Sequence, residues 1–331
     1  MSRVEAMTAT DDFVRQADTY RPELLAHCYR MLGSVHDAED QVQETYLRAW
    51  RAADRFEGRS SLRTWLYRIA TNACLTALDQ KGRRPLPSGL GPPERDARQP
   101  LAARRPEVPW LEPMPDALIA PDPAAVVVSR DTVRLAFVAA LQHLLPRQRA
   151  VLILRDVLAW SAAEVADLLE TSTAAVNSTL QRARAQLAEV MPAEDTTVEP
   201  SEADRRALLR RFVTTLEAGD VTSFVQLLRE DAALEMPPVP TWFAGRDVVA
   251  GFYADHLLDD PSVWRFTPTG ANGQPAVAMY RDEGDGVYRA HNLQVLTLDG
   301  DRVAGVVAFR DPGLFEAFGL PSAYPSAAAA G

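Results

Sequence analysis

The first residues that could bind another macromolecule lie between positions 37 and 50, where acidic and apolar side chains follow helical spacing. One side of such a helix carries the apolar residues Ala38, Val42, Tyr46 and Ala49. The opposite side carries the acids Asp37, Asp40 and Glu44. Acids confined to the side away from an apolar stripe favour a docking surface for a basic partner. The alternative reading is an ordinary solvated face.

A second set of residues, between positions 161 and 187, suits the reading of duplex DNA. Ser161-Ala162-Ala163-Glu164 is a capping box that begins a short helix, and a turn at 171–172 leads to a second helix near Thr173. The core side of that second helix is predicted to hold Val176, Leu180, Ala183 and Leu187. Its other sides carry Ala174, Ser178, Gln181, Arg182 and Ala185, which suit a major groove. The pattern predicts a helix-turn-helix, with a plain three-helix bundle as the alternative.

A third segment, residues 55–72, has the chemistry of single-strand binding. A loop with Phe56 and Arg59 precedes a long helix whose Arg63 and Arg68 are expected to point outward. Such a loop can hold an unstacked base while arginines grip phosphates. Trp65 and Tyr67 fit core packing better than base stacking.

Residue composition and hydrophobic periodicity divide the chain into several regions. Residues 11–82 read as consecutive helices, and helical spacing returns from about 129 to 191. Between them lies a stretch rich in Pro, Arg and Gly that cannot form a core of its own. After residue 200, helical patterns at 202–218 and 221–229 give way to alternating runs at 276–281, 286–298 and 302–310. The last part is therefore expected to be an α+β domain with an antiparallel sheet.

Length, apolar runs, cysteine positions and charge limit the classes of protein to which the chain can belong. A length of 331 residues predicts two or three domains. The chain has no run of eighteen apolar residues and no basic-then-apolar start, so we expect a soluble, cytoplasmic protein with no membrane contact. Cys28 and Cys74 lie in amphipathic helical patterns and are expected to pack in the core, so no metal and no cofactor is predicted. The net charge of -10 hides an uneven distribution, because acids dominate after about residue 194.

Together these segments resemble the extracytoplasmic-function (ECF) sigma factors of the sigma-70 family over most of residues 11–190. Residues 37–50 resemble region 2.2, residues 59–72 resemble regions 2.3 and 2.4, and residues 145–187 resemble region 4. The resemblance implies two partners: core RNA polymerase, bound at its beta-prime clamp helices and beta flap, and promoter DNA.

The resemblance also implies roles for individual residues. Contacts with core polymerase would come from Asp37, Asp40, Gln43 and Glu44. The -10 element would lie near Phe56, Arg59, Ser60, Arg63 and Asn72. The -35 element would lie near Thr173, Ser178, Gln181 and Arg182.

Two features go beyond a minimal ECF factor: a long linker containing residues 109–116, with Trp110, and a chain that continues past region 4. Both resemble the ECF subgroup fused to a SnoaL-like domain of the ketosteroid-isomerase cone type, in which the extension is thought to regulate the sigma factor. The Trp110 segment would be a docking site for that extension. Alternatively, it is a polyproline-like linker whose Trp packs locally.

A cone of this kind curls a sheet around a cavity that can hold a small apolar ligand. The candidate pocket residues are Trp242, Tyr253, His256 and His291, and the other polar or aromatic candidates are Glu235, Tyr280 and Tyr288. No pair among them has a spacing that demands proton abstraction, so no catalytic residue and no enzyme activity is expected.

The predicted fold is multidomain, with two all-α domains followed by an α+β SnoaL-like cone. The predicted bounds are 11–83 for sigma region 2, 84–128 for a Pro/Arg-rich linker, 129–191 for region 4 and 200–322 for the cone. Two other classes stay open. One is a stand-alone helix-turn-helix regulator with a ligand-binding domain, and the other is a cone-type enzyme with a helical appendage.

Overall fold

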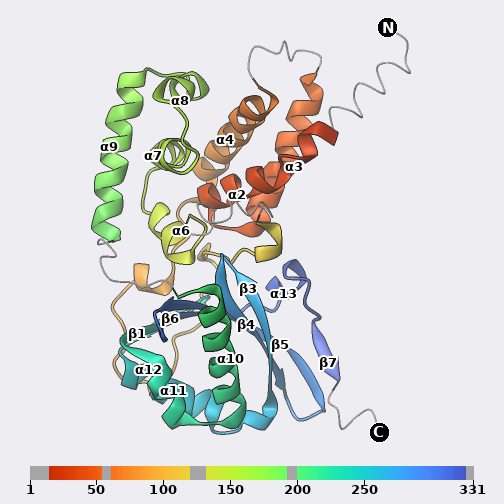
Figure 1. The fold of residues 1–331 in the computed structure, drawn as a ribbon, viewed down its shortest axis with the longest axis vertical. Helices are drawn as coiled ribbons and strands as arrows, with labels where there is room; N and C mark the ends of the chain where they lie inside the picture. Colours follow the sequence, from red (N-terminus) through yellow and green to blue (C-terminus); the bar gives the residue numbers. More distant parts are fainter. Residues whose placement is uncertain (1–14, 54–60, 120–131, 192–199, 326–331) are drawn as a thin grey trace. The chain divides into compact units, whose positions relative to one another are not determined.

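The computed structural model describes residues 15–53, 61–119, 132–191 and 200–325 (Figure 1). The chain forms two compact units. The helical unit combines Met1–Arg84 with Leu118–Ala193, and the sheet unit combines Pro85–Ala117 with Glu194–Gly331. Most of the predicted linker therefore belongs to the same unit as the C-terminal domain. No helix among the described residues is long and apolar enough to cross a membrane.

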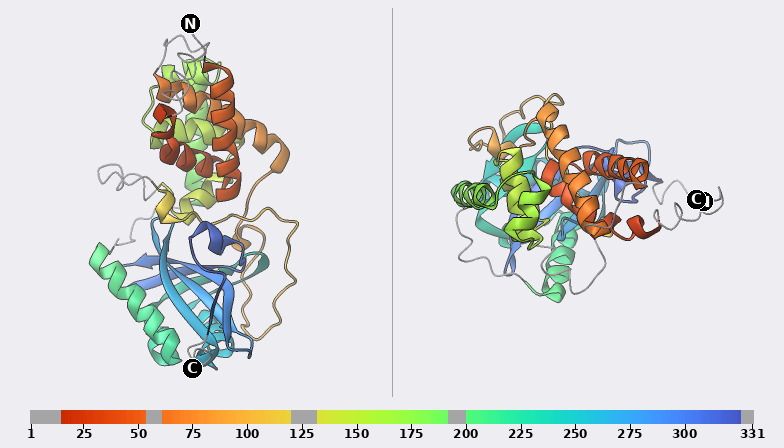
Figure 2. Two further views of the ribbon diagram at one scale, coloured as in Figure 1. Left: turned by 90° about the vertical axis from the view of Figure 1, so that its right-hand side faces the viewer. Right: turned by 90° about the horizontal axis from the view of Figure 1, so that it is seen from above.

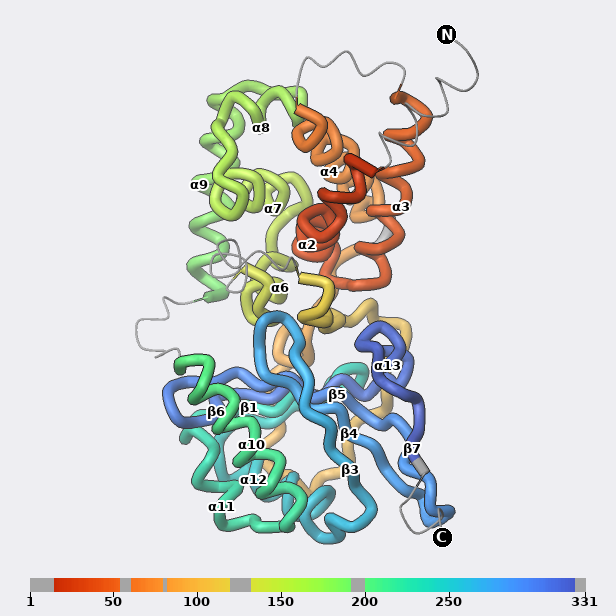
Figure 3. The backbone as a smooth tube through the Cα atoms, turned by 45° about the vertical axis from the view of Figure 1, so that its right-hand side comes forward, coloured from red at the N-terminus to blue at the C-terminus, as the bar shows by residue number. Residues whose placement is uncertain are grey.

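Three consecutive helices form the first part of the helical unit, as predicted. They are α2 (Arg21–Leu32), α3 (Val35–Arg51) and α4 (Leu62–Lys81), and they pack on one another (Figure 3). Gly33 ends α2 with a positive φ of 70°, a conformation that costs glycine little. The side chains of Ser34 and Ser61 cap α3 and α4 by accepting backbone N–H groups. Cys28 and Cys74 are free and buried, which confirms their predicted place in the core.

The second part of the helical unit contains the predicted helix-turn-helix. It comprises α6 (Leu135–Leu141), α7 (Pro146–Leu152), the π-helical turn η4 (Ile153–Val157), α8 (Ala162–Leu168) and α9 (Thr173–Val190). The capping box of Ser161 and Glu164 is present at the start of α8. Val176, Leu180 and Ala183 are buried, and α9 packs on α7 and α8, as the spacing predicted.

Two buried arginines help to join the two parts of the helical unit. Arg30 on α2 donates to the carbonyl oxygen and the hydroxyl of Thr132, at 3.1 and 2.8 Å. Arg149 on α7 donates to the carbonyl oxygen of Met31 at the end of α2. Both guanidiniums satisfy backbone acceptors inside the unit, a role that no local sequence pattern indicates.

The sheet unit is built on a seven-stranded sheet with the order β2-β1-β6-β5-β4-β3, and β7 pairs with β5. The strands are β1 (Leu228–Met236), β2 (Val239–Ala244), β3 (Trp264–Ala271), β4 (Gln274–Asp282), β5 (Val287–Asp299), β6 (Arg302–Phe309) and β7 (Ala323–Pro325). The three predicted strands correspond to β4, β5 and β6. The expectation of a wholly antiparallel sheet is wrong, because β1 and β6 pair in parallel. Their connection spans most of the domain, so no hairpin fixes their relative direction.

Helices cover this sheet and complete its core. They are α10 (Glu202–Ala218), α11 (Val221–Leu227), α12 (Arg246–Tyr253) with the π-helical turn η5 (Ala254–Leu258), the 3-10 turn η6 (Pro261–Val263), and α13 (Leu314–Ala317). Helix α10 lies against β3 and β4, and α12 lies against β1 and β2 (Figure 2). Phe212, Phe224 and Tyr253 form an aromatic cluster at the centre of this core.

Residues 85–117 run along the sheet unit with little regular structure beyond two 3-10 turns, η2 (Pro87–Gly89) and η3 (Asp116–Leu118) (Figure 2). Their backbone bonds to the sheet at several points. Glu94 N–H donates to the carbonyl oxygen of Trp242, and the Met114 and Asn272 residues exchange two hydrogen bonds of 2.8 and 2.9 Å. Trp110, Leu111 and Met114 are buried. The Trp110 segment is thus part of the C-terminal unit's packing.

Candidate polymerase, DNA and ligand-binding sites

The exposed side of α3 is a continuous stripe of polar and large apolar side chains. Asp40 and Gln43 are exposed, and Glu44 is half-buried and bridges to Arg48 at 2.7 Å. Leu47 and Trp50 are 48% and 55% exposed, although large apolar side chains are usually inside. We call these five residues, Asp40, Gln43, Glu44, Leu47 and Trp50, the α3 stripe. An aromatic anchor beside acids fits a partner that is both apolar and basic.

Asp37 is not part of the α3 stripe. The prediction that Asp37 lies with Asp40 and Glu44 on the solvent side of the helix is therefore wrong for Asp37. Its side chain is buried and pairs with Arg84 at 2.5 Å. Its backbone N–H is also the donor that the Ser34 cap accepts. Asp37 lies in the first turn of α3, where the helix dipole favours a carboxylate and where Arg84, three residues after the end of α4, reaches it.

The residues predicted for the -10 element are only partly described. Phe56, Arg59 and Ser60 lie outside the described residues. Arg63 was expected to point outward, but it is half-buried in a fork-like pair with Glu23 of α2 and lies over the ring of Tyr67. The Glu23 hydrogen bond raises the pKa of Arg63.

Asn72 lies nine residues further along α4 than Arg63 and is exposed, so it stays available to a partner. Tyr67 is fully buried, as predicted for a core residue. Its ring packs edge-on against that of Trp160, with the ring centroids 5.5 Å apart. Arg68 is exposed and donates to the carbonyl oxygen of Asp167 in α8, at 3.3 Å.

The four residues predicted for the -35 element lie together on the exposed side of α9. They are Thr173, Ser178, Gln181 and Arg182. Among the described residues, the guanidinium of Arg182 has one hydrogen-bond partner, the hydroxyl of Thr179 at 3.4 Å, and no ion-pair partner, so its charge can meet a base edge or a phosphate. Arg184, two residues on, is instead held by Asp156 through two hydrogen bonds of 2.7 and 2.8 Å. The two arginines of α9 therefore differ in what they can bind.

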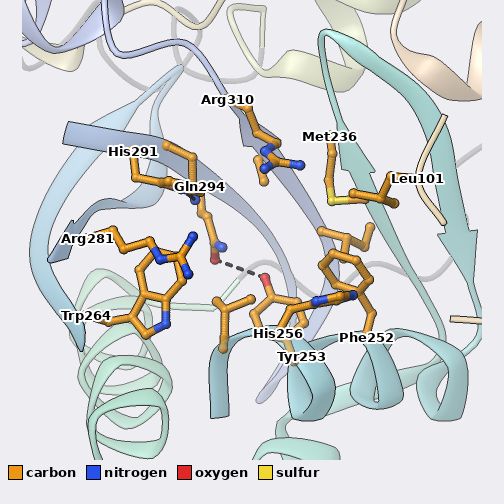
Figure 4. Close-up of a pocket in the computed structure, with 14 residues that line it drawn as sticks. Leu101, Met236, Phe252, Tyr253, His256, Trp264, Arg281, His291, Gln294 and Arg310 are labelled. Atoms are coloured by element: carbon orange, nitrogen blue, oxygen red, sulfur yellow. Dashed lines mark hydrogen bonds between the residues drawn. The ribbon is translucent and has the colours of Figure 1, made fainter. Parts of the chain in front are cut away.

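The sheet unit contains a cavity of about 170 Å³ between α12, β1, β5 and β6 (Figure 4). Tyr253, His256 and His291 line it, as predicted. The hydroxyl of Tyr253 donates to the side-chain oxygen of Gln294 at 3.0 Å across the floor of this cavity. Burial raises the pKa of Tyr253 far above its ordinary value, so its hydroxyl stays protonated.

The other aromatic and acidic candidates lie elsewhere. Trp242 does not line the cavity, because its indole N–H donates to the carbonyl oxygen of Gly91. Tyr280 packs on Phe315 and Tyr324, and Tyr288 donates to the carbonyl oxygen of Ser262. Glu235 accepts the backbone N–H of Ser88 at 2.8 Å, and burial raises the pKa of its carboxyl.

Sequence reasoning missed most of the polar lining of the cavity. Beyond the three predicted residues, the lining includes Leu101, Trp264, Arg281, Asn292, Gln294 and Arg310. Among the described residues, none that lines the cavity carries a carboxylate. Burial and the charges of Arg310, Arg281 and Arg104 lower the pKa of His291 to about 4. Leu101 comes from the segment read as a linker, which no local pattern assigns to a pocket.

Comparison with known protein families finds the predicted domains in the predicted order along the chain. Residues 17–84 match the Sigma-70 region 2 family, residues 134–187 match Sigma-70 region 4, and residues 209–314 match the SnoaL-like domain family. The region 4 match covers α6 to α9, and the SnoaL-like match covers all of the sheet except β7.

Individual relatives share this whole arrangement. The chain is 54% identical over 313 residues to the protein named ECF RNA polymerase sigma factor SigG of Mycobacterium tuberculosis, covering 94% of this chain and 84% of that one. The crystal structure of the extracytoplasmic function sigma factor SigJ of the same species has 25% identity and a TM-score of 0.59, over 93% of this chain and 99% of that one. The chain therefore belongs to the ECF RNA polymerase sigma factors, in a form that carries a C-terminal SnoaL-like domain.

Proposed function

We propose that this sigma factor docks core RNA polymerase through the α3 stripe and reads the -35 element with the exposed side of α9. The observation that carries the proposal is the set of four hydrogen-bonding side chains gathered on α9, with their apolar neighbours turned inward. A recognition helix in the major groove needs this separation. The protein would act in the cytoplasm, where RNA polymerase works.

Run-off transcription with bacterial core polymerase on a selected promoter library tests this proposal. Promoter-specific transcripts that depend on the added full chain are expected. Binding to DNA without polymerase, and no dependent transcript, would favour a stand-alone helix-turn-helix regulator instead.

Arg182→Ala is expected to weaken binding to the -35 duplex by roughly 1 to 3 kcal/mol if Arg182 reads a base edge, because a bidentate base contact is worth about that much. Arg184→Ala is the matched control on the same helix, since Arg184 is already paired with Asp156. Fluorescence anisotropy with intact holoenzyme and labelled -35 DNA measures both. Equal losses for the two variants would remove Arg182 from the recognition surface.

We also propose that the C-terminal unit modulates transcription through residues 85–117. Support comes from the segment's attachment: Met114 and Asn272 exchange backbone and side-chain hydrogen bonds, and Asp116 accepts the N–H of Gly273 at 2.7 Å. This segment joins regions 2 and 4 and is also held by the sheet. A conformational change in the sheet domain can therefore be passed to the sigma regions through it.

Asn272→Gly combined with Asp116→Ala tests this regulatory role in the full chain. Asn272 has a positive φ of 59°, so glycine keeps the turn while the side-chain bond to Met114 is lost. We expect a changed transcript yield, whose direction gives the sign of the regulation. Asp301→Ala, in the exposed β5–β6 turn, is the control. A yield unchanged from the wild type in both variants would contradict regulation through this attachment.

The cavity, on our proposal, binds a ligand and does not turn it over. Proton abstraction needs a base close to its substrate. The described lining supplies no carboxylate, and His291 is a weak base because its pKa lies near 4. His256, the other histidine of the described lining, packs on the ring of Phe252, and no described carboxylate of the lining orients it as a base. Incubation of the full chain with ketosteroid or epoxide substrates would reveal turnover if the third reading, a cone-type enzyme, were correct.

The Glu235 contact with Ser88 gives a pH-dependent test of how the segment is attached. Because burial raises the pKa of Glu235 in the folded protein, its protonated form stabilises the fold, and that stability is lost as the pH rises through the folded pKa. Glu235→Gln keeps an acceptor for Ser88 but cannot ionise. We expect its melting temperature to exceed that of the wild type increasingly as the pH rises from 4 to 8. A constant difference across this range would contradict the assignment.

A further inference from the structure

The cavity of the sheet unit gathers positive charge that no carboxylate of the described residues neutralises. Arg281 at the end of β4 and Arg310 just after β6 both line it. The guanidinium of Arg281 lies 5.4 Å from the ring centre of Trp264, and that of Arg310 has no hydrogen-bond or ion-pair partner in the described part of the chain, where only the backbone of Arg310 is bonded. Burial lowers the pKa of Arg310, and the nearby charges of Arg104 and Arg281 lower it further. Like charges that repel in this way favour an anion between them.

The side of the cavity opposite Arg281 is mostly apolar. Figure 4 places Arg281 and His291 on one side and Leu101, Met236 and Phe252 on the other, with Arg310 between the two. His256 also lies on the apolar side, where its ring packs on that of Phe252 with the centroids 4.4 Å apart. The cavity volume of about 170 Å³ is close to the roughly 150 Å³ of an apolar cavity that holds benzene. A ligand that fits both sides has an anionic head and a small apolar body.

The same cavity involves the segment that joins regions 2 and 4. Leu101 supplies part of the apolar side, and Arg104 donates to the backbone carbonyl oxygen of Arg310. Around them, Ala102 N–H donates to the hydroxyl of Thr241, and Arg105 N–H donates to the carbonyl oxygen of Pro238. A ligand in the cavity would therefore touch both the sheet and Leu101, and residues 102–105 next to Leu101 are hydrogen-bonded to the same sheet.

We propose that this cavity binds a small organic monocarboxylate, with one aromatic ring or a chain of about six to eight carbons, and that the bound carboxylate holds residues 101–105 on the sheet. Its head pairs with Arg281 and Arg310, because a carboxylate accepts guanidinium hydrogen bonds in a fork. Its body replaces water against Leu101, Met236 and Phe252. The inference rests on the proposed binding role of the cavity and is independent of promoter recognition.

Isothermal titration calorimetry of the full chain tests the ligand class. The probes are benzoate, phenylacetate and octanoate, each compared with a neutral counterpart of the same body: benzyl alcohol, 2-phenylethanol and 1-octanol. At least one carboxylate is expected to bind roughly tenfold or more tightly than its neutral counterpart, since a charge-assisted pair is lost in the alcohol. Equal binding of acid and alcohol, or no binding of any probe, would overturn the proposal.

Charge-removing variants locate the head group. Arg310→Gln and Arg281→Gln are each expected to weaken carboxylate binding about tenfold while leaving the alcohol unaffected. The control is Arg265→Gln, because Arg265 lies over the ring of Tyr324 and does not line the cavity. Retained affinity in both cavity variants would contradict the assigned site. Should a variant fail to fold, as judged by its melting curve, Met236→Trp would test the site by filling its apolar side.

Hydrogen exchange tests the second half of the proposal. With the bound carboxylate, the backbone amides of residues 101–105 are expected to exchange about tenfold more slowly than in the free protein. Unchanged exchange despite measured binding would refute the coupling to this segment. Run-off transcription by the full chain without ligand tests the sigma-factor proposal, whereas calorimetry and hydrogen exchange test ligand binding. A failure of one proposal can therefore be distinguished from a failure of the other.

Discussion

Trp50→Ala is expected to weaken the affinity of this sigma factor for core RNA polymerase by about 2 kcal/mol, or roughly 30-fold. Trp50 is 55% exposed at the end of the α3 stripe, and the fold itself gives it little burial. An exposed Trp next to acidic residues is the kind of anchor that dominates the energy of an interface. The loss of the indole should therefore affect binding far more than it affects folding.

Charge reversal tests the acidic part of the same stripe. Adding Asp40→Arg and Glu44→Arg to Trp50→Ala is expected to abolish co-purification with core polymerase, because like charges would then face a basic partner. Asp37 is left unchanged, since its reversal would oppose Arg84 in a buried pair and unfold the site. Asp79→Arg, an exposed acid on α4, is the matched control. Normal core binding by the triple variant would remove the α3 stripe from the polymerase interface.

Arg149→Ala is expected to destabilise the helical unit by about 3 kcal/mol. Arg149 is 2% exposed, and besides Met31 it donates to the side chain of Gln142 at 2.9 Å and to the carbonyl oxygen of Leu144 at 3.3 Å. Its removal leaves a void and buried acceptors without donors. Burial also lowers the pKa of Arg149 to about 10, which still leaves it charged at neutral pH.

Hydrogen exchange in α2 and α7 measures this effect, because it reports on the helical unit separately from the sheet unit. Arg147→Ala is the control, since Arg147 is exposed on the same helix. Arg149→Met, which restores volume but not donors, should recover part of the loss. Equal exchange rates in Arg149→Ala and Arg147→Ala would mean that Arg149 does not join the two parts of the unit.

Local chemistry predicted the helical elements well. The capping box at Ser161, the turn before Thr173 and the core positions of α9 depend on residues close in sequence, and all three are present. Four -35 candidates share one exposed side for the same reason, since helical periodicity alone sets which side chains point away from a core. The three strands with alternating patterns were also found where they were predicted.

The predictions for some site residues were wrong because these residues pair with groups that are distant in the sequence. Asp37 and Arg63 have the spacing of surface groups, yet Arg84 and Glu23 draw them into pairs. Trp242 is aromatic and lies in the right domain, but its indole N–H is taken by Gly91 of the linker segment. Pairing across tens of residues leaves no periodic signal in the sequence.

The sequence by itself determined the family, the order of the domains and the exposed side of α9, because each depends on short-range patterns. Only the tertiary structure decided that residues 85–117 pack with the C-terminal domain and that Arg281 and Arg310 meet in one cavity. A proline-rich segment has no core of its own, so its place depends on the backbone groups and apolar surface that the folded sheet offers it. The chemistry of the cavity likewise arises only when strands far apart in sequence pair side by side.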